Sequence, residues 1–195
     1  MQLYSKPASR KPPTLCRLAC LLLLFIALPA QSHASGFEVL MAQTRLQENV
    51  YLLDSRVKLR FSDEAQKALQ SGIPLIILLD IEVEKERWWW NKNIATLQQG
   101  YLLLYHALTE KYIVNHLNSG AQHDYTSLGA TLSALERIRD LPLIDSSLLI
   151  KGDEYQARLR VRLDIESLPA PMRPLAYISS DWQLASDWYT WPLKH

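Results

Sequence analysis

The chain has 195 residues, of which 48% are hydrophobic and 21% charged, with 21 Lys and Arg against 20 Asp and Glu. Its two cysteines, Cys16 and Cys20, both lie near the N-terminus, which excludes a disulfide framework for the rest of the chain. The balanced charge offers no basic surface of the kind that binds nucleic acid, so we expect no nucleic-acid partner.

The first 34 residues have the pattern of a cleaved secretory signal. Four basic residues precede an apolar run over residues 18–30: Lys6, Arg10, Lys11 and Arg17. Small residues in "SHA" then stand before Ser35, as a signal peptidase requires. The run is shorter than the ~20 apolar residues that span a bilayer. Cys20 lies at the start of the run and not after it, so we predict an exported chain without a stable lipid anchor.

Removal of residues 1–34 would change the charge balance of the chain. Four basic residues and no acidic ones would be lost, which leaves 17 Lys and Arg against 20 Asp and Glu. The remaining residues contain no cysteine, so the core alone must hold them together. About 160 residues suffice for one such core.

Alternation of polar and apolar residues predicts three long strands, each with one face toward solvent. The polar faces of "DSRVKLRF" (54–61) and "QARLRVRLDIE" (156–166) are mainly basic. The polar face of "LDIEVEKE" (79–86) is acidic. Because opposite charges across a strand pair are stabilising, we expect the acidic strand, residues 75–86, to pair with at least one basic strand.

Two short amphipathic helices are predicted between the strands. Ser62 is a suitable N-cap for "DEAQKALQ", and Gly72 and Pro74 end that helix. The second helix covers residues 126–139, where four apolar side chains form one stripe and Pro142 discourages continuation. These side chains are Leu128, Leu132, Leu135 and Ile138.

Further strands are predicted at residues 37–44, 100–108, 111–117 and about 186–191, with a tight turn in "LTEKY". About seven antiparallel strands with two helices indicate a mainly β fold, either an antiparallel β-sandwich or a flattened barrel. No repeat or linker follows residue 35, so we expect a single domain over residues 35–195.

Several segments of the chain resemble the bacterial domain-of-unknown-function family 4390: "IEVEKERWWW", "YHALTEKYIV", "IRDLPLID" and "SSDWQLASDWYTWPL". The likeness extends over nearly the whole chain after the signal. Because members of this family are similar in carrying a signal peptide, the resemblance implies a periplasmic location. Proteins of this kind are often encoded beside a membrane sensor histidine kinase of the nitrogen-regulation type, so the resemblance implies a genomic association with such a kinase. It implies no particular activity.

The most unusual stretch is "ERWWWN", in which Trp88, Trp89 and Trp90 stand at the end of a predicted strand. One interpretation is that these rings plug an open end of the sandwich against Trp182, Trp188 or Trp191, because aromatic rings commonly cover cores. The other is that at least one ring stays exposed as a binding tip. The closing segment, with Trp188 and Trp191, is the alternative aromatic binding site, although we expect it to be structural.

Other candidate sites are weaker. The arginine row Arg158, Arg160 and Arg162 suits an oxyanion, but pairing with acidic residues of the neighbouring strand explains it without a ligand. No pair among His106, His116, His123 and His195 has a typical metal-ligand spacing, so we expect no metal and no cofactor. Nucleophile elbows and phosphate-binding glycine loops are also missing from the sequence, so we expect no catalytic residues.

Two functions remain open from the sequence. The first is a non-enzymatic periplasmic interaction domain that docks through the tryptophans on a periplasmic or membrane protein. The second is a ligand-binding or glycan-processing protein in which the aromatic rings stack on sugars. In that case Glu86 and Asp181 are candidate carboxylates, and they would have to lie ~5 to 10 Å apart across a cleft.

Overall fold

The computed structural model describes residues 36–194, and the predicted signal peptide and His195 lie outside these residues. Within them the chain forms nine β-strands in two antiparallel sheets, together with three α-helices. This confirms the predicted mainly β, sandwich-like class. Among residues 36–194 there is no helix with the length and apolar character needed to cross a membrane.

The strands are β1 (Gly36–Gln47), β2 (Val50–Arg60), β3 (Leu75–Lys85), β4 (Lys92–His106), β5 (Lys111–His116), β6 (Gln122–Tyr125), β7 (Arg137–Asp145), β8 (Tyr155–Leu163) and β9 (Tyr189–Pro192). The helices are α2 (Asp63–Gln70), α3 (Leu128–Leu135) and α4 (Arg173–Ile178), with single 3₁₀ turns η2 (Ser146–Leu148) and η3 (Ile165–Ser167).

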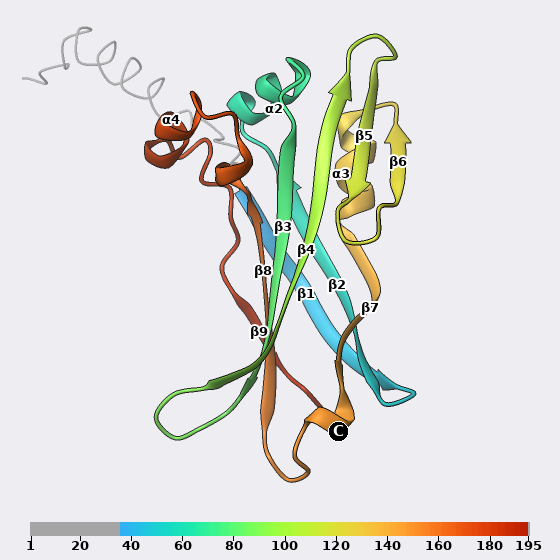
Figure 1. Cartoon of the computed structure of the whole chain (residues 1–195), viewed down its shortest axis with the longest axis vertical. Helices are drawn as coiled ribbons and strands as arrows, with labels where there is room; N and C mark the ends of the chain where they lie inside the picture. The colour runs from blue at the N-terminus through green and yellow to red at the C-terminus, as the bar shows by residue number, and fades with distance from the viewer. Residues whose placement is uncertain (1–35, 195) are drawn as a thin grey trace, which may run out of the picture. The chain divides into compact units, whose positions relative to one another are not determined.

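The smaller sheet has the order β1-β2-β7, and the larger has the order β6-β5-β4-β3-β8-β9 (Figure 1). Helices α2 and α4 lie at one end of the strands. The β1–β2 turn, the β3–β4 loop and the β7–β8 connection lie at the other end. These three connections form what we call the loop end of the domain.

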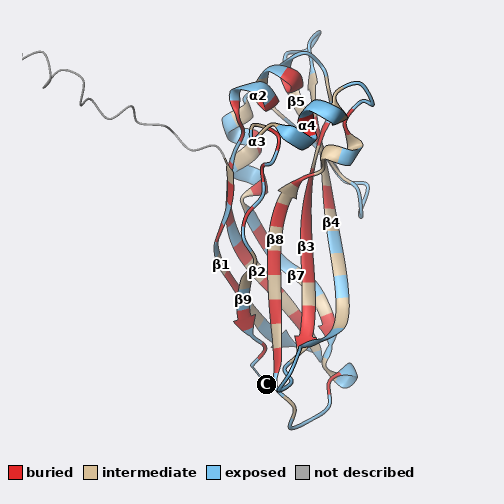
Figure 2. Ribbon diagram, turned by 90° about the vertical axis from the view of Figure 1, so that its left-hand side faces the viewer, coloured by how far each residue is buried: buried red, intermediate tan, exposed pale blue. Residues whose placement is uncertain are grey.

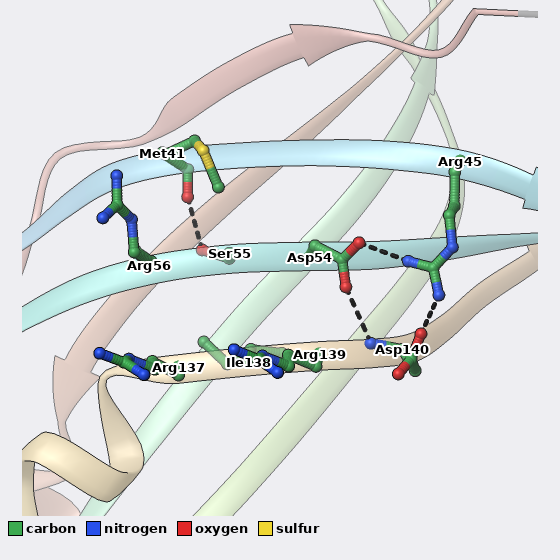
Figure 3. Close-up of a pocket in the computed structure, with 9 residues that line it drawn as sticks. All are labelled: Met41, Arg45, Asp54, Ser55, Arg56, Arg137, Ile138, Arg139 and Asp140. Carbon is green, nitrogen blue, oxygen red and sulfur yellow. Dashed lines mark hydrogen bonds and ion pairs between the residues drawn. The ribbon is translucent and has the colours of Figure 1, made fainter.

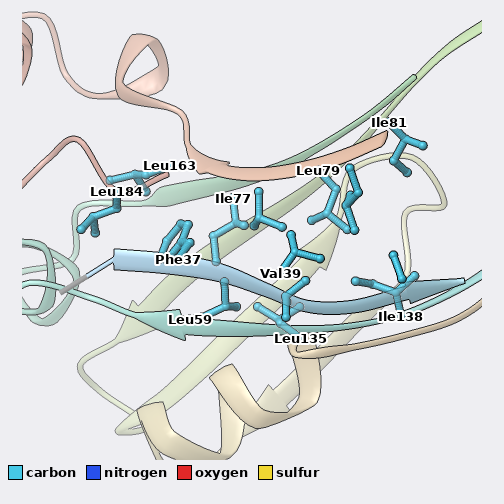
Figure 4. Packing of buried hydrophobic residues seen from close by; sticks show 14 of the residues in the cluster. Phe37, Val39, Leu59, Ile77, Leu79, Ile81, Leu135, Ile138, Leu163 and Leu184 are labelled. Carbon is cyan, nitrogen blue, oxygen red and sulfur yellow. The ribbon is translucent and has the colours of Figure 1, made fainter. Parts of the chain in front are cut away.

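The core lies between the two sheets, where alternate residues of β1, β2 and β8 and most residues of β3 are buried (Figure 2). Phe37, Val39 and Leu59 of the smaller sheet are in one cluster with Ile77 and Leu79 of β3 (Figure 4). Each fully buried aliphatic or aromatic side chain stabilises the fold by roughly 1.5–3 kcal/mol. The alternation seen in the sequence therefore corresponds to an inner and an outer face of each sheet.

The first helix agrees with its prediction. Ser62 is the N-cap of α2, and its Oγ accepts a hydrogen bond from the Ala65 amide at 3.1 Å. The second helix, predicted over residues 126–139, is wrong at its C-terminal end. Helix α3 ends at Leu135, and Arg137 begins strand β7. Ile138, assigned to the helical stripe, is instead buried in the sheet.

Residues 137–145 form strand β7 because they pair with the side of β2 that β1 leaves open. Pro142 is compatible with this strand because β7 lies at the edge of its sheet, where one side needs no amide donor. Strand β6 and helix α4 were also absent from the sequence prediction. Both are short, with four and six residues, and neither shows a long periodic pattern.

Candidate functional site

The three consecutive tryptophans lie in the loop of residues 86–91, between β3 and β4, at the loop end of the domain (Figure 1). We call these six residues the tryptophan loop. The exposed fractions of Trp88, Trp89 and Trp90 are 89%, 82% and 71%. The rings of Trp88 and Trp89 meet edge-on, with 6.3 Å between their centroids. The interpretation that these rings plug the sandwich is therefore wrong.

The base of the tryptophan loop is held by hydrogen bonds. Lys85, the last residue of β3, pairs with Lys92, the first residue of β4, directly below the loop. The amide of Glu86 donates to the carbonyl of Glu154 at 3.0 Å, which ties the loop to the start of β8. Lys85 also forms an ion pair with Asp153. The base of the loop is thus anchored to β8, while its three tryptophan rings are exposed to solvent.

Glu84 connects this base to the larger sheet. Its side chain accepts hydrogen bonds from Asn91 Nδ2 at 2.9 Å and Gln156 Nε2 at 3.1 Å. Arg158 lies 3.0 Å from its other carboxylate oxygen. Only 6% of Glu84 is exposed, although the alternation of β3 predicted a solvent-facing position. Side chains from β8 and from the tryptophan loop cover it.

More apolar side chains are exposed at the loop end. Leu46 lies near the β1–β2 turn, Leu148 lies in η2, and Ile150 follows η2. None of these three side chains lies in the β3–β4 loop that carries the tryptophans. Exposed apolar side chains are not confined to this end, since Leu175, Tyr177 and Ile178 of α4 are also exposed.

The structure does not support the sugar-binding cleft that the second function requires. Three hollows in the described part of the chain are lined by residues other than Trp88–Trp90. Glu86 follows the last residue of β3, whereas the Asp181 carbonyl accepts from Ser62 Oγ, near the start of α2. The 11 residues of β3 separate these positions by roughly 35 Å. The proposed carboxylate pair is therefore wrong, and the exposed rings of Trp88–Trp90 give the aromatic cleft no support.

The aromatic tail is part of the fold, as expected. Trp191 pairs with Ala157 of β8, is only 7% exposed, and donates from Nε1 to Thr44 Oγ1 at 3.3 Å. The Trp188 ring is half-buried beneath the guanidinium groups of Arg158 and Arg160, at 4.6 and 4.7 Å. Burial of Trp191 leaves that ring little surface for a ligand.

The arginine row of β8 is paired with acidic residues of β3, as the charge pattern predicted. Arg158 Nε donates a hydrogen bond to Glu82 at 2.9 Å. Asp80 accepts hydrogen bonds from Arg160 at 3.1 Å and from Arg162 at 2.7 Å. Burial acts to raise the pKa of Asp80, but its hydrogen bonds from Arg162, Gln98 and Arg160 together bring that pKa below its ordinary value. The row is thus explained without a bound anion.

The histidines form a small aromatic contact. The rings of His116 and His123 lie 5.7 Å apart, and His116 also packs edge-on against Tyr101 at 4.7 Å. Burial, and then the neighbouring His123, lower the pKa of His116. Among residues 36–194 no group of three or more potential ligands is arranged to hold a metal ion. His106 is engaged elsewhere, with Nδ1 3.0 Å from Thr109 Oγ1.

Sequence reasoning missed a second group of arginines, on the outer face of the smaller sheet. Arg137 and Arg139 were assigned to a helix, but they lie on β7 beside Arg56 of β2. The alternation of charged and apolar residues over 137–139 could have indicated a strand. The leucine stripe of α3 just before it has helical spacing, and Ile138 fits that spacing too, so the change from helix to strand was not apparent.

The comparisons with known proteins agree with the resemblance drawn from the sequence. A model of a domain of unknown function, DUF4390, matches residues 34–192, which include every described strand. No curated protein and no solved structure matches the chain significantly. The chain therefore belongs to the domain-of-unknown-function family DUF4390.

Proposed function

We propose that the protein is an exported, periplasmic interaction domain without enzymatic activity, and that it docks on a partner protein through the tryptophan loop. The observation that carries this proposal is the exposure of three adjacent tryptophans, each more than 70% accessible. Trp182 and Trp191, by contrast, are buried in the core. Tryptophan is enriched among the residues that contribute most to protein–protein binding.

The anchoring of the loop supports a recognition role. The hydrogen bonds from Asn91 to Glu84 and from Glu86 to Glu154 fix both ends of the loop. A partner would then bind the rings without first ordering the backbone that carries them, which lowers the entropic cost of association. The exposed Leu46, Leu148 and Ile150 at the same end would extend the contact.

The charges around the loop favour a protein over an anionic membrane surface. Glu86 precedes Arg87 in the loop and Lys92 follows it, while Glu154 is joined to Glu86 by a backbone hydrogen bond, so acidic and basic groups are mixed. Segments that bind anionic lipids carry clusters of basic residues instead. A projecting loop of this kind fits a partner with an apolar hollow and a polar rim.

The cellular setting follows from the sequence pattern and the family resemblance. The signal-like residues 1–34 support export, and the absence of a cysteine after the apolar run supports a protein without a lipid anchor. The resemblance makes the periplasmic region of a membrane sensor kinase the first partner to test. We expect neither a nucleic-acid partner nor a cofactor.

A pull-down from periplasmic extract tests this function. The bait is the mature chain, in the wild-type form and with Trp88, Trp89 and Trp90 all changed to alanine. The matched control is Leu108→Ala, because Leu108 is 93% exposed but lies in the β4–β5 turn, away from the loop end.

We expect the triple variant to lose its partner while remaining folded, and the Leu108 control to retain it. The purified triple variant should then bind the purified partner at least tenfold more weakly than the wild type does, because each aromatic side chain buried on binding contributes on the order of 1–2 kcal/mol or more. Equal binding by the wild type and a folded triple variant would exclude the tryptophan loop as the docking surface.

A further inference from the structure

The two arginine-rich regions of the domain differ in how their charge is balanced. The β8 row is paired with Asp80, Glu82 and Glu84 of β3. The second region lies on the outer face of the smaller sheet and comprises Arg56 of β2 with Arg137 and Arg139 of β7. Within residues 36–194, these three side chains form neither an ion pair nor a hydrogen bond, whereas Arg45 nearby forms two ion pairs. We call the three residues the arginine cluster.

The register brings the unpaired charges together. Arg56 and Arg137 are direct partners across the β2–β7 pair. Like charges in directly opposite positions destabilise a sheet. Glu136, next in sequence to Arg137, does not relieve this repulsion, because its Oε1 accepts a hydrogen bond from the Leu59 amide at 3.1 Å. The arginine cluster thus keeps an unfavourable arrangement that the fold itself does not compensate.

A β-bulge shapes the strand beside the cluster. Ser55 pairs with Ile138 and Leu53 pairs with Leu141, so Arg139 and Asp140 together oppose Asp54. Asp140 has a φ of 54°, in the left-handed region that non-glycine residues rarely adopt. Bulges and such backbone angles occur preferentially at functional sites, where they redirect side chains.

A polar network holds this bulge in place. Asp54 Oδ1 accepts a hydrogen bond from the Asp140 amide at 3.0 Å. Arg45 of β1 forms ion pairs with both Asp54 and Asp140 (Figure 3). Both carboxylates are therefore engaged with Arg45, and neither has an ion pair with a member of the arginine cluster.

The arginine cluster and the bulge surround an open hollow of about 470 Å³, which Figure 3 shows from close by. Its lining carries four arginines and two aspartates, and Met41 supplies apolar surface. A guanidinium group offers several N–H donors in one plane, which suits the oxygens of a phosphate group. Two or three arginines around one hollow match the charge of a phosphate better than that of a single carboxylate.

From this geometry we infer an anion-binding site in which Arg56, Arg137 and Arg139 bind a phosphate group. The phosphate could belong to a free phosphate compound or to a phospholipid headgroup. Asp54, Asp140 and Arg45 would act as positioning residues that hold the bulge. This inference does not depend on the function proposed for the tryptophan loop, which belongs to a different part of the chain.

The experiment measures binding of phosphate by the mature protein in two arms. The first arm titrates inorganic phosphate at constant ionic strength, balanced with chloride, and follows the melting temperature and the heat of binding. The second arm measures cosedimentation with vesicles of phosphatidylglycerol, against vesicles of phosphatidylcholine alone. The variants are Arg56→Gln and Arg137→Gln, and the control is Lys67→Gln, which removes the same charge from an exposed position in α2, outside both the arginine cluster and the tryptophan loop.

We expect binding in at least one arm, weakened at least tenfold by Arg56→Gln and by Arg137→Gln and unchanged by Lys67→Gln. Binding to free phosphate would identify a soluble ligand, and binding only to phosphatidylglycerol vesicles would identify a headgroup. Without phosphate, both cluster variants should melt no lower than the wild type, because each removes one of two opposed charges. The inference is overturned if neither arm shows binding by the wild type, or if Lys67→Gln weakens binding as much as the cluster variants do.

Discussion

Glu84 links the tryptophan loop to the arginine row of β8, and its removal should affect both. Its carboxylate accepts from Asn91 and Gln156 and is paired with Arg158. We expect Glu84→Ala to lower the free energy of unfolding by about 2–3 kcal/mol, since buried partners of a charged group lose their acceptor. Denaturant unfolding measures this change. The control Glu86→Ala removes an exposed carboxylate and should stay within about 0.5 kcal/mol of the wild type. Equal effects of the two substitutions would contradict the role assigned to Glu84.

Asp80 should make stability depend on pH. Burial disfavours its charged form, but hydrogen bonds from Arg162, Gln98 and Arg160 outweigh this and lower its pKa from the ordinary 3.8. Because the pKa in the folded state is below that in the unfolded state, the carboxylate contributes stability above about pH 4. This contribution disappears as the pH falls through the lower, folded-state pKa.

The substitution Asp80→Asn should therefore destabilise the protein at pH 7, by about 1–2 kcal/mol. The difference from the wild type should begin to shrink below about pH 4, where the unfolded chain takes up a proton at this carboxyl group, and it should be lost as the pH falls through the lower, folded-state pKa. Unfolding free energies measured between pH 3 and pH 7 test this. A difference that stays constant over that range would show that the charge of Asp80 is not responsible.

At the scale of elements, strand β9 attaches the end of the chain to the larger sheet. Trp191 is its main buried side chain, so we expect Trp191→Ala to lower the free energy of unfolding by about 3–5 kcal/mol. Trp89→Ala makes the same chemical change at an exposed position and should cost less than about 0.5 kcal/mol. Chemical denaturation of both variants measures this difference in unfolding free energy. The slopes of free energy against denaturant concentration are compared as well. Similar midpoints would mean that β9 contributes little packing.

Sequence reasoning located the elements whose alternation extends over many residues. Strands β2, β3 and β8 were anticipated because charged and apolar residues alternate along them, and the pairing of β3 with β8 followed from their opposite charges. Strand β7 was missed because the leucine stripe of α3 continues in register into Ile138. The choice between a buried and an exposed tryptophan loop could not be made, since an aromatic run fits either a core or a surface. The arginine cluster depends on which strands become neighbours across a bulge, which local periodicity does not encode.

At the scale of the whole molecule, export is the property that the sequence pattern predicts most directly. We expect the protein recovered from the periplasm to begin at Ser35, because small residues precede that position and an apolar run lies before them. Intact-mass spectrometry of the fractionated protein checks the cleavage site. A chain that stays in the cytoplasm at full length would contradict the proposed location.

The central claim is that the tryptophan loop contacts a partner protein in the cell, and site-specific photocrosslinking tests it most directly. A photoreactive amino acid replaces Trp89 in one strain and Leu108 in another, since both side chains are more than 80% exposed and they lie on opposite ends of the domain. The account predicts a discrete crosslinked product of defined mass from position 89 and none from position 108. If intact cells yield no product from position 89, or the same products from both positions, the tryptophan loop is not the docking surface.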